Sequence, residues 1–327
     1  MSESPSADAS PSSWMAWAQL VRLPNVFTII ADVGAAYLMM AGGPKHLPSF
    51  AFVICCGIAL YWAGMILNDV FDVERDRQER PGRPIPAGQI ALSQAVTAGW
   101  MLLLIGVLLS VAVGFLSPGV EGFFWQPVAV AIALAVMIVA YDGPLKRSPL
   151  APVAMGGCRV LSCLLGAFTG LGSGGGLGTT GGVLPNFAFA IAAGFGVYIM
   201  GLTTMARREA TGGRSPNLWI GWLVLLVGVS MMAFAPQLER YPSVFQVRPN
   251  MFAVLIYLVA APAVFRALRA IIEPEPLRIQ LAIRVSIMTI IPLAACFAFL
   301  GAGPAWGMAI FLLTIPSTML SIRFRVT

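Results

Sequence analysis

The chain has 327 residues, of which 58% are hydrophobic and 10% are charged, and its formal net charge is +6 at pH 7. A mean hydropathy of +0.84 excludes an ordinary soluble enzyme or binding module. The composition indicates a polytopic all-α membrane protein, because backbone polar groups in lipid must be satisfied within each helix.

The N-terminal residues 1–13 are rich in Ser, Pro and Ala, which predicts a disordered tail before a single membrane domain over 14–327. The tail has no basic stretch, and the first apolar run that follows has full length. We therefore expect no cleaved signal peptide.

Ten runs approach the roughly 20 apolar residues that a membrane span needs. They cover residues 20–42, 50–71, 94–116, 124–141, 150–172, 185–205, 218–236, 250–271, 279–301 and 303–322. A glycine-rich segment, 173–182, predicts a flexible linker between two halves, about 14–172 and 183–301, with 303–322 as an extra C-terminal helix. Pro292 and Pro316 predict kinks in the last two runs.

The loops between these runs carry an uneven positive charge. With a cytoplasmic N-terminus, sixteen Lys and Arg residues fall in inner segments and three in outer loops. The positive-inside rule then predicts a multi-pass protein of the bacterial inner membrane, with the N-terminus and the loop after the second run in the cytoplasm. The pI of about 9.4 follows from basic loops facing anionic lipid and requires no nucleic-acid partner.

The first run contains an acidic residue at membrane depth, Asp32. An ionisable side chain inside a membrane is costly, and it points either to function or to a partner within the bundle. Arg159 in the fifth run is the deep cation available, so an Asp32–Arg159 ion pair is a candidate interaction.

The second run ends in the segment NDVFDVERDRQERPGRPIPAG, residues 68–88. Asp69, Asp72 and Asp76 are spaced i, i+3 and i+7, which puts three carboxylates on one face of a helix. Such like charges need a cation, and oxygen ligands suit Mg²⁺, which keeps positions open for phosphate oxygens. The arginines that follow supply phosphate-pairing groups. The segment predicts a Mg²⁺–diphosphate site at the membrane surface, and a charged loop that merely solvates the interface is the alternative.

The same segment resembles a known family. N-D-x-x-D-x-x-x-D followed by R-P-x-R-P-x-P-x-G is similar to the first aspartate motif of the UbiA superfamily of intramembrane prenyltransferases, and the resemblance extends from Arg22 to about Arg284. It implies a bundle of nine to ten transmembrane helices around a central cavity. It also implies Mg²⁺-dependent transfer of a prenyl group from a polyprenyl diphosphate to a hydrophobic acceptor in the bilayer.

The segment after the fourth run narrows this resemblance. Asp142 directly follows Tyr141, and G-P-L-K-R-x-P-L-x-P-x-x-M-G-x-C-R then ends at Arg159, a pattern similar to the EboC-like branch of UbiA-type proteins, which are encoded in biosynthetic operons. The resemblance implies that Lys146 helps to hold diphosphate, although an ordinary loop lysine is the alternative. Residues assigned to the substrate cavity are Arg22, Asn25, Asp32, Tyr141, Asp142 and Arg159.

The loop after the sixth run departs from the family pattern. The family has a second aspartate motif here, whereas this loop has one acid, Glu209, beside Arg207 and Arg208. Only half of a two-metal arrangement can form, and two ions would stabilise a leaving diphosphate more than one. The arginines either contact phosphate in place of the second ion or indicate that ionisation of the diphosphate has been lost.

These patterns give the following residue assignments. Predicted catalytic residues are Asp69, Asp72, Asp76 and Lys146. Predicted metal-binding residues are Asn68, Asp69, Asp72, Asp76 and Glu209. Predicted diphosphate-binding residues are Arg80, Arg83, Lys146, Arg207 and Arg208.

Prenyl transfer is the first functional hypothesis. Two others stay open: a UbiA-fold protein that binds or transports a lipid-like precursor without prenyl transfer, and a polytopic scaffold for neighbouring enzymes. Mg²⁺-dependent diphosphate binding separates the first two from the scaffold, and product formation separates the first from the second.

Overall fold

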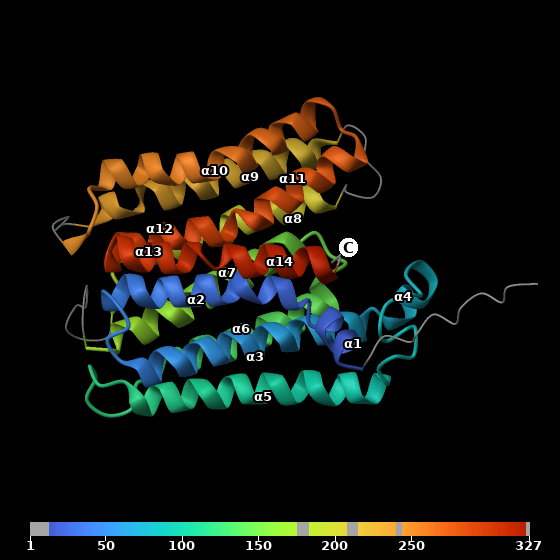
Figure 1. The fold of residues 1–327 in the computed structure, drawn as a ribbon, viewed down its shortest axis with the longest axis horizontal. Helices are drawn as coiled ribbons and strands as arrows, with labels where there is room; N and C mark the ends of the chain where they lie inside the picture. The colour runs from blue at the N-terminus through green and yellow to red at the C-terminus, as the bar shows by residue number, and fades with distance from the viewer. Residues whose placement is uncertain (1–12, 175–182, 208–214, 240–243, 325–327) are drawn as a thin grey trace, which may run out of the picture.

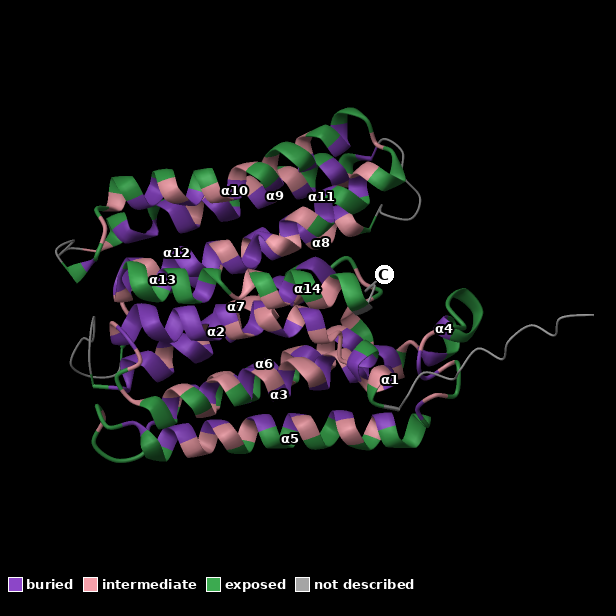
Figure 2. Cartoon of the chain, viewed as in Figure 1, coloured by how far each residue is buried: buried purple, intermediate pink, exposed green. Residues whose placement is uncertain are grey.

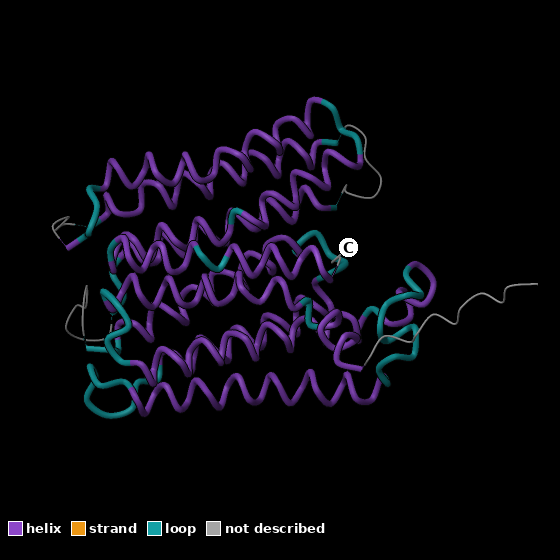
Figure 3. The backbone as a smooth tube through the Cα atoms, viewed as in Figure 1, coloured by secondary structure: helices purple, strands orange, loops and turns teal. Residues whose placement is uncertain are grey.

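A computed structural model describes residues 13–174, 183–207, 215–239 and 244–324, and these residues form helices and loops without a β-strand (Figure 1, Figure 3). Ten helical segments within them are long and apolar enough to cross a membrane. These are Leu23–Ala41, Leu47–Phe71, Leu92–Leu116, Gln126–Leu145, Ala151–Leu171, Asn186–Ala206, Pro216–Leu238, Pro249–Ile272, Pro276–Ala302 and Pro304–Arg323. The all-α membrane architecture and the ten predicted runs are therefore confirmed, with boundaries that agree to within a few residues.

The individual helices follow these spans closely, and several begin at a proline, whose missing N–H would be unpaired in a first turn anyway. The α-helices are α1 (Ser13–Leu20), α2 (Val26–Ala41), α3 (Leu47–Phe71), α4 (Val73–Glu79), α5 (Leu92–Leu116), α6 (Gln126–Ala140), α7 (Ala151–Leu171), α8 (Asn186–Ala206), α9 (Pro216–Phe234), α10 (Pro249–Ile272), α11 (Pro276–Met288), α12 (Ile290–Ala302), α13 (Pro304–Phe311) and α14 (Thr314–Phe324). Short helical turns are η1 (Leu23–Asn25), η2 (Tyr141–Leu145) and η3 (Ala235–Leu238).

The last two spans are each broken near a proline. Thr289 separates α11 from α12, and residues 312–313 separate α13 from α14. Pro292 and Pro316 have no N–H to donate to the carbonyl four residues earlier, so the helical hydrogen bonding is interrupted there. Helix breaks thus lie beside both prolines at which kinks were predicted.

Helix α2 lies in the middle of the bundle and is buried almost throughout, whereas α5 exposes much of its surface (Figure 2). Helix α2 packs against α3, α7 and α12. Glycines permit this close approach: a Cβ on Gly170 would lie 2.4 Å from the Tyr37 carbonyl oxygen, and one on Gly301 would lie 2.0 Å from that of Met39. Small residues at helix contacts are expected in a membrane, where association depends on close packing.

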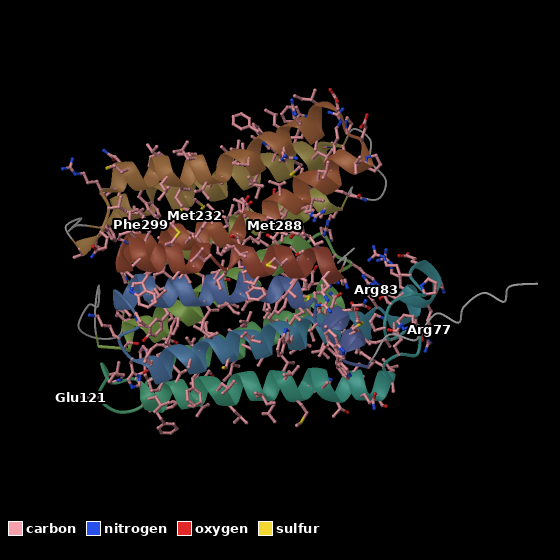
Figure 4. The ribbon with its side chains drawn as sticks, viewed as in Figure 1. Arg77, Arg83, Glu121, Met232, Met288 and Phe299 are labelled. Carbon is pink, nitrogen blue, oxygen red and sulfur yellow. The ribbon has the colours of Figure 1, made fainter. Side chains whose placement is uncertain are left out.

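The aspartate segment lies at one end of the bundle, where α4 projects beyond α3 and where α1 and the end of α14 also lie (Figure 1). Arg77 and Arg83 mark this end, and Glu121 marks the opposite end (Figure 4). Ala16 and Leu20 of α1 form a small hydrophobic cluster with Ile85 and Ile90 of the loop after α4. Residues 1–12 of the predicted tail and 175–182 of the predicted linker lie outside the described residues.

Candidate functional site

The three motif aspartates do not share one continuous helix. Asp69 lies in the last turn of α3, Asp72 lies at the junction with φ −93° and ψ 3°, and Asp76 lies in α4. The helical hydrogen bonding almost continues, because the Asp76 N–H donates to the Asp72 carbonyl over 2.8 Å. The three aspartates therefore lie on two successive helices and their junction, and not on the one helix that the spacing predicted.

Arg83 joins two of these carboxylates. Its Nη1 donates to Asp69 Oδ1 over 3.2 Å and to Asp76 Oδ2 over 2.6 Å. The side chains of Asp69 and Asp76 are only 8% and 6% exposed, so this guanidinium offsets charge in a setting with little solvent screening. The proline-containing turns over residues 81–90 bring Arg83 back onto the helices.

Arg22 adds a second cation beside Asp69. Its Nη2 lies 3.8 Å from Asp69 Oδ1, and its backbone adopts the left-handed region at φ 47° and ψ 56°. That conformation is uncommon for a residue with a Cβ, and here it ends α1 and turns the chain into η1. Asn25, at the end of η1, donates its backbone N–H to the Arg22 carbonyl over 2.9 Å. Both predicted residues of the first span therefore lie at the aspartate end of the bundle.

The remaining motif aspartate, Asp72, pairs with Lys146, the residue predicted to hold diphosphate. Lys146 donates to Asp72 Oδ2, and the Lys146 side chain remains 21% exposed. Both residues line a cavity of about 300 Å³, within the lower range for ligand pockets. The cavity is lined by Phe71, Asp72, Asp142, Gly143, Pro144, Lys146 and Arg147.

A turn of π-helix, η2, positions the remaining acid of this cavity. Pro144 lacks the N–H that an α-helix would use there, and π-turns within helices are frequent at functional sites. Asp142 is buried, and its Oδ1 accepts a 2.8 Å hydrogen bond from Asn68 Nδ2. Its Oδ2 is buried without a hydrogen-bond partner in the described part of the chain. Sequence reasoning missed this turn, although Gly143-Pro144 at the end of an apolar run was a signal for it.

The predicted Asp32–Arg159 ion pair is confirmed within the bundle. Arg159 Nη1 donates to Asp32 Oδ2 over 2.9 Å, linking α7 to α2. The Arg159 guanidinium carbon also lies 5.8 Å from the ring centroid of Phe195 on α8. This aromatic face stabilises the cation by its quadrupole.

Two other predicted diphosphate ligands, Arg80 and Arg207, do not line this cavity. Arg207 Nη2 donates to the Ser148 carbonyl over 2.6 Å, which ties the end of α8 to the loop after η2. Arg80 is exposed, and its guanidinium forms no ion pair among the described residues. Arg208 and Glu209 lie outside the described residues. Tyr141 is half-buried in η2.

The exposed face of α4 carries ordinary surface ion pairs. Arg75 pairs with Glu79 over 2.9 Å and Arg77 with Glu74 over 2.5 Å. The hydrogen bond from Arg75 to Glu79 raises the pKa of Arg75. Such exposed pairs contribute little to stability, and they lie outside the cavity. They are useful as controls for the buried pairs.

The donor set of the site fits a hard divalent cation. Carboxylate and amide oxygens of Asn68, Asp69, Asp72 and Asp76 gather at one end of the bundle, and hard cations prefer oxygen ligands. No three His, Cys, Asp or Glu side chains of the described residues form a ready metal-holding group. Arg83 and Lys146 already occupy the carboxylates, so a cation would have to displace them.

Comparisons with known proteins identify related chains. The model of the UbiA prenyltransferase family matches residues 27–326. A digeranylgeranylglyceryl phosphate synthase of Sulfurisphaera tokodaii is 37% identical over 99 residues, 29% of this chain and 34% of the relative. That of Sulfolobus acidocaldarius is 24% identical over 69% of this chain and 78% of the relative. Protoheme IX farnesyltransferase of Caulobacter vibrioides is 29% identical over 47% of this chain and 44% of the relative.

Solved structures share the fold. A structure of digeranylgeranylglyceryl phosphate synthase in membranes has a TM-score of 0.62 at 19% identity, covering 89% of this chain and 99% of that one. A UbiA homolog from Archaeoglobus fulgidus bound to GPP and Mg²⁺ has a TM-score of 0.57 at 13% identity, covering 91% of this chain and 99% of that one. The chain spans about a third of the length of the Sulfurisphaera relative.

Proposed function

Because the chain belongs to the UbiA prenyltransferase family, we propose that it transfers a prenyl group from a polyprenyl diphosphate to a hydrophobic acceptor within the membrane, with Mg²⁺ as cofactor. The observation that carries this proposal is the pairing of Asp72 with Lys146 on the wall of a cavity at one end of the bundle, where Arg83 also joins Asp69 and Asp76. The Archaeoglobus homolog with bound GPP and Mg²⁺ supports the same chemistry.

The proposed metal ligands are Asn68, Asp69, Asp72 and Asp76, with Glu209 from the loop after α8. A bound divalent ion would withdraw charge from the diphosphate and so assist its departure. The proposed diphosphate ligands are Arg80, Arg83, Lys146, Arg207 and Arg208. Of these, Lys146 already lines the cavity and donates to Asp72.

In the proposed reaction the bond between the prenyl carbon and the diphosphate oxygen breaks, and its electron pair stays with the diphosphate. The acceptor supplies the electron pair of the new bond and loses a proton. Basic side chains fixed near the departing oxygens stabilise the charge that develops there, and such electrostatic stabilisation is often the largest catalytic contribution.

The narrower assignments rest on the sequence. The pattern from Asp142 to Arg159 supports placing the chain in the EboC-like branch, in a biosynthetic pathway. We also infer one membrane domain over 14–327, in which 303–322 is an addition to two halves. The cavity assignment covers Arg22, Asn25, Asp32, Tyr141, Asp142 and Arg159.

One observation favours a second function. The motif carboxylates pair with Arg83 and Lys146, and the loop after α8 supplies a single acid, Glu209. A UbiA-fold protein that binds or transports a lipid-like precursor would need recognition of the diphosphate without its ionisation. This alternative predicts Mg²⁺-dependent binding and no diphosphate release.

The deciding experiment uses the purified protein in nanodiscs with Mg²⁺ and labelled geranylgeranyl diphosphate. Retention of label and release of diphosphate are followed together. We expect Mg²⁺-dependent release, and Asp72→Ala should lower its rate by about a hundredfold or more, as for loss of one preorganised electrostatic group. The matched control is Glu74→Ala, which removes an exposed acid of α4. Tight Mg²⁺-dependent retention without release, with all candidate acceptors, would instead establish the binding or transport function.

A further inference from the structure

The ion pair of Asp32 and Arg159 lies within the membrane-spanning part of the bundle. Arg159 is eight residues past the start of α7, which corresponds to roughly 12 Å along the helix axis. The Asp32 side chain has no exposed surface, whereas that of Arg159 keeps 14%. Helix α7 packs against α2, α3, α6 and α8, so the pair lies among the helices of the bundle.

The hydrogen-bonding capacity of this pair is largely unused. A guanidinium has five N–H donors, and Arg159 uses one nitrogen, Nη1, in its 2.9 Å bond to Asp32 Oδ2. Its other nitrogens have no hydrogen-bond partner among the described residues, whereas the Asp32 carboxylate also has the Ser162 side chain beside it. Unpaired polar groups at membrane depth are costly, so their retention indicates that a ligand completes the site.

The pair is also close to the candidate diphosphate site. Tyr61 on α3 is near enough to interact electrostatically with both Arg159 and Arg22, and it also lies beside the Asn25 side chain. Arg22 in turn lies 3.8 Å from Asp69. Polar groups thus extend from Arg159 toward Asp69, on the side where the prenyl group would separate from the diphosphate.

The charge of the pair decides which ligand it suits. Asp32 offsets the charge of Arg159, so the pair is neutral as a whole. An anionic ligand would add an uncompensated negative charge at membrane depth, where desolvation of an unpaired ion is expensive. An uncharged oxygen, such as a carbonyl, accepts hydrogen bonds from the free guanidinium nitrogens without that cost.

We propose that Arg159, held in place by Asp32, binds an uncharged carbonyl oxygen of the acceptor that receives the prenyl group. This inference rests on the proposed prenyl transfer and adds the chemical class of its acceptor. Arg159 touches the substrate, and Asp32 is a positioning residue that also sets the preference for uncharged ligands.

The test measures binding to the protein in nanodiscs without Mg²⁺ or diphosphate, so its result is independent of turnover. The probes are 1,4-naphthoquinone, which is uncharged and has two carbonyls, and 2-naphthoate, an anion of similar size. Binding to protein-free nanodiscs is subtracted. We expect the unmodified protein to bind the quinone about tenfold or more tightly than the naphthoate, the effect of a charged hydrogen-bond donor.

Substitutions of Arg159 and Asp32 test whether this pair causes the preference for the quinone. Arg159→Met should abolish the excess quinone binding, and Asp32→Asn should raise naphthoate binding about tenfold by leaving the guanidinium uncompensated. Arg77→Gln, which removes an exposed arginine, is the matched control and should change neither value. Quinone binding that survives Arg159→Met, or an Asp32→Asn variant that keeps the original preference, would overturn the proposal.

A double variant covers the case in which Asp32→Asn does not fold. Asp32→Asn with Arg159→Gln removes both charges together and leaves no unpaired ion at membrane depth. It should bind both probes weakly and equally, and a retained quinone preference would overturn the proposal. If the binding pattern holds but no diphosphate is released from labelled substrate, the site stands and the proposed transfer fails. If transfer is observed without this pattern, the inference about the acceptor fails.

Discussion

Two basic residues neutralise the motif aspartates in the ligand-free chain. Arg83 bridges Asp69 and Asp76, and Lys146 pairs with Asp72. A divalent ion must displace these cations before it can use the carboxylates. Lys146→Met should therefore tighten the binding of Mg²⁺ alone about tenfold and weaken the binding of inorganic pyrophosphate by a similar factor, since charged hydrogen bonds have this magnitude.

Isothermal titration of the protein in nanodiscs with Mg²⁺ and, separately, with pyrophosphate measures both effects. Arg77→Gln is the control, because its partner Glu74 is exposed and lies outside the cavity. An unchanged Mg²⁺ affinity in Lys146→Met would show that Lys146 does not compete for the carboxylate.

Some contacts of individual residues could be predicted from the sequence, and others could not. The Asp32–Arg159 pair was predictable, because the apolar runs contain few deep charges and each deep charge needs a partner. The contact of Arg83 with Asp76 was not, because it depends on how the turns over 81–90 fold back. The Asn68–Asp142 hydrogen bond was not predictable either, because it depends on the π-turn. Residue spacing along the sequence does not tell how close two separate spans lie.

Among the elements, α2 and α12 make a contact that a glycine permits. A Cβ at residue 301 would lie 2.0 Å from the Met39 carbonyl oxygen, so Gly301→Ala should force the helices apart and cost about 1–3 kcal/mol, as overpacking does. The control is Gly157→Ala within α7, where the nearest atom would be Met137 Cε at an ordinary 3.5 Å. Thermal unfolding in detergent should show a lower midpoint for Gly301→Ala than for Gly157→Ala, and equal midpoints would contradict this packing.

Helix α1 holds the loop that carries Arg83. Leu20 is 1% exposed and packs in the cluster that contains Ile85 and Ile90. Leu20→Glu would place a charge in this cluster, so we expect faster amide hydrogen exchange over residues 84–90 by about tenfold or more, because burial of an unpaired charge favours the locally open state. Gln19, which is exposed on the same helix, supplies the comparison: Gln19→Glu adds the same charge at the surface and should leave the exchange of this loop nearly unchanged.

Helices and helix breaks were predicted best where a single property of the sequence determines them. Ten apolar runs gave ten spans, because each needs only length and hydropathy to be found. Pro292 and Pro316 gave the helix breaks, because a missing N–H is visible in the sequence. The break at Asp72 was missed, because neither proline nor glycine marks it and the hydrogen bonds around it remain nearly helical.

At the scale of the whole molecule, the candidate site and the ends of the described chain lie on one side. Helices α1 and α4 and the end of α14 share one end of the bundle, and Glu121 lies at the other (Figure 1, Figure 4). Sixteen of the lysines and arginines fall in the predicted inner segments of the sequence and three in the predicted outer loops, so the positive-inside rule predicts that the site faces the cytoplasm. A water-soluble diphosphate group would then reach the site from the cytoplasm.

This orientation predicts the behaviour of reporter fusions in bacteria. A green fluorescent protein at the C-terminus should fluoresce and an alkaline phosphatase there should be inactive, because the phosphatase needs an oxidising compartment for its disulfides. Phosphatase inserted at Glu121, at the opposite end, should be active. The reverse pattern would put the aspartates outside the cell. Seven helical spans separate residue 121 from the C-terminus, so the two fusions should report opposite sides of the membrane. Two active phosphatase fusions would mean that the chain crosses the membrane an even number of times between them, which would exclude one of the ten spans.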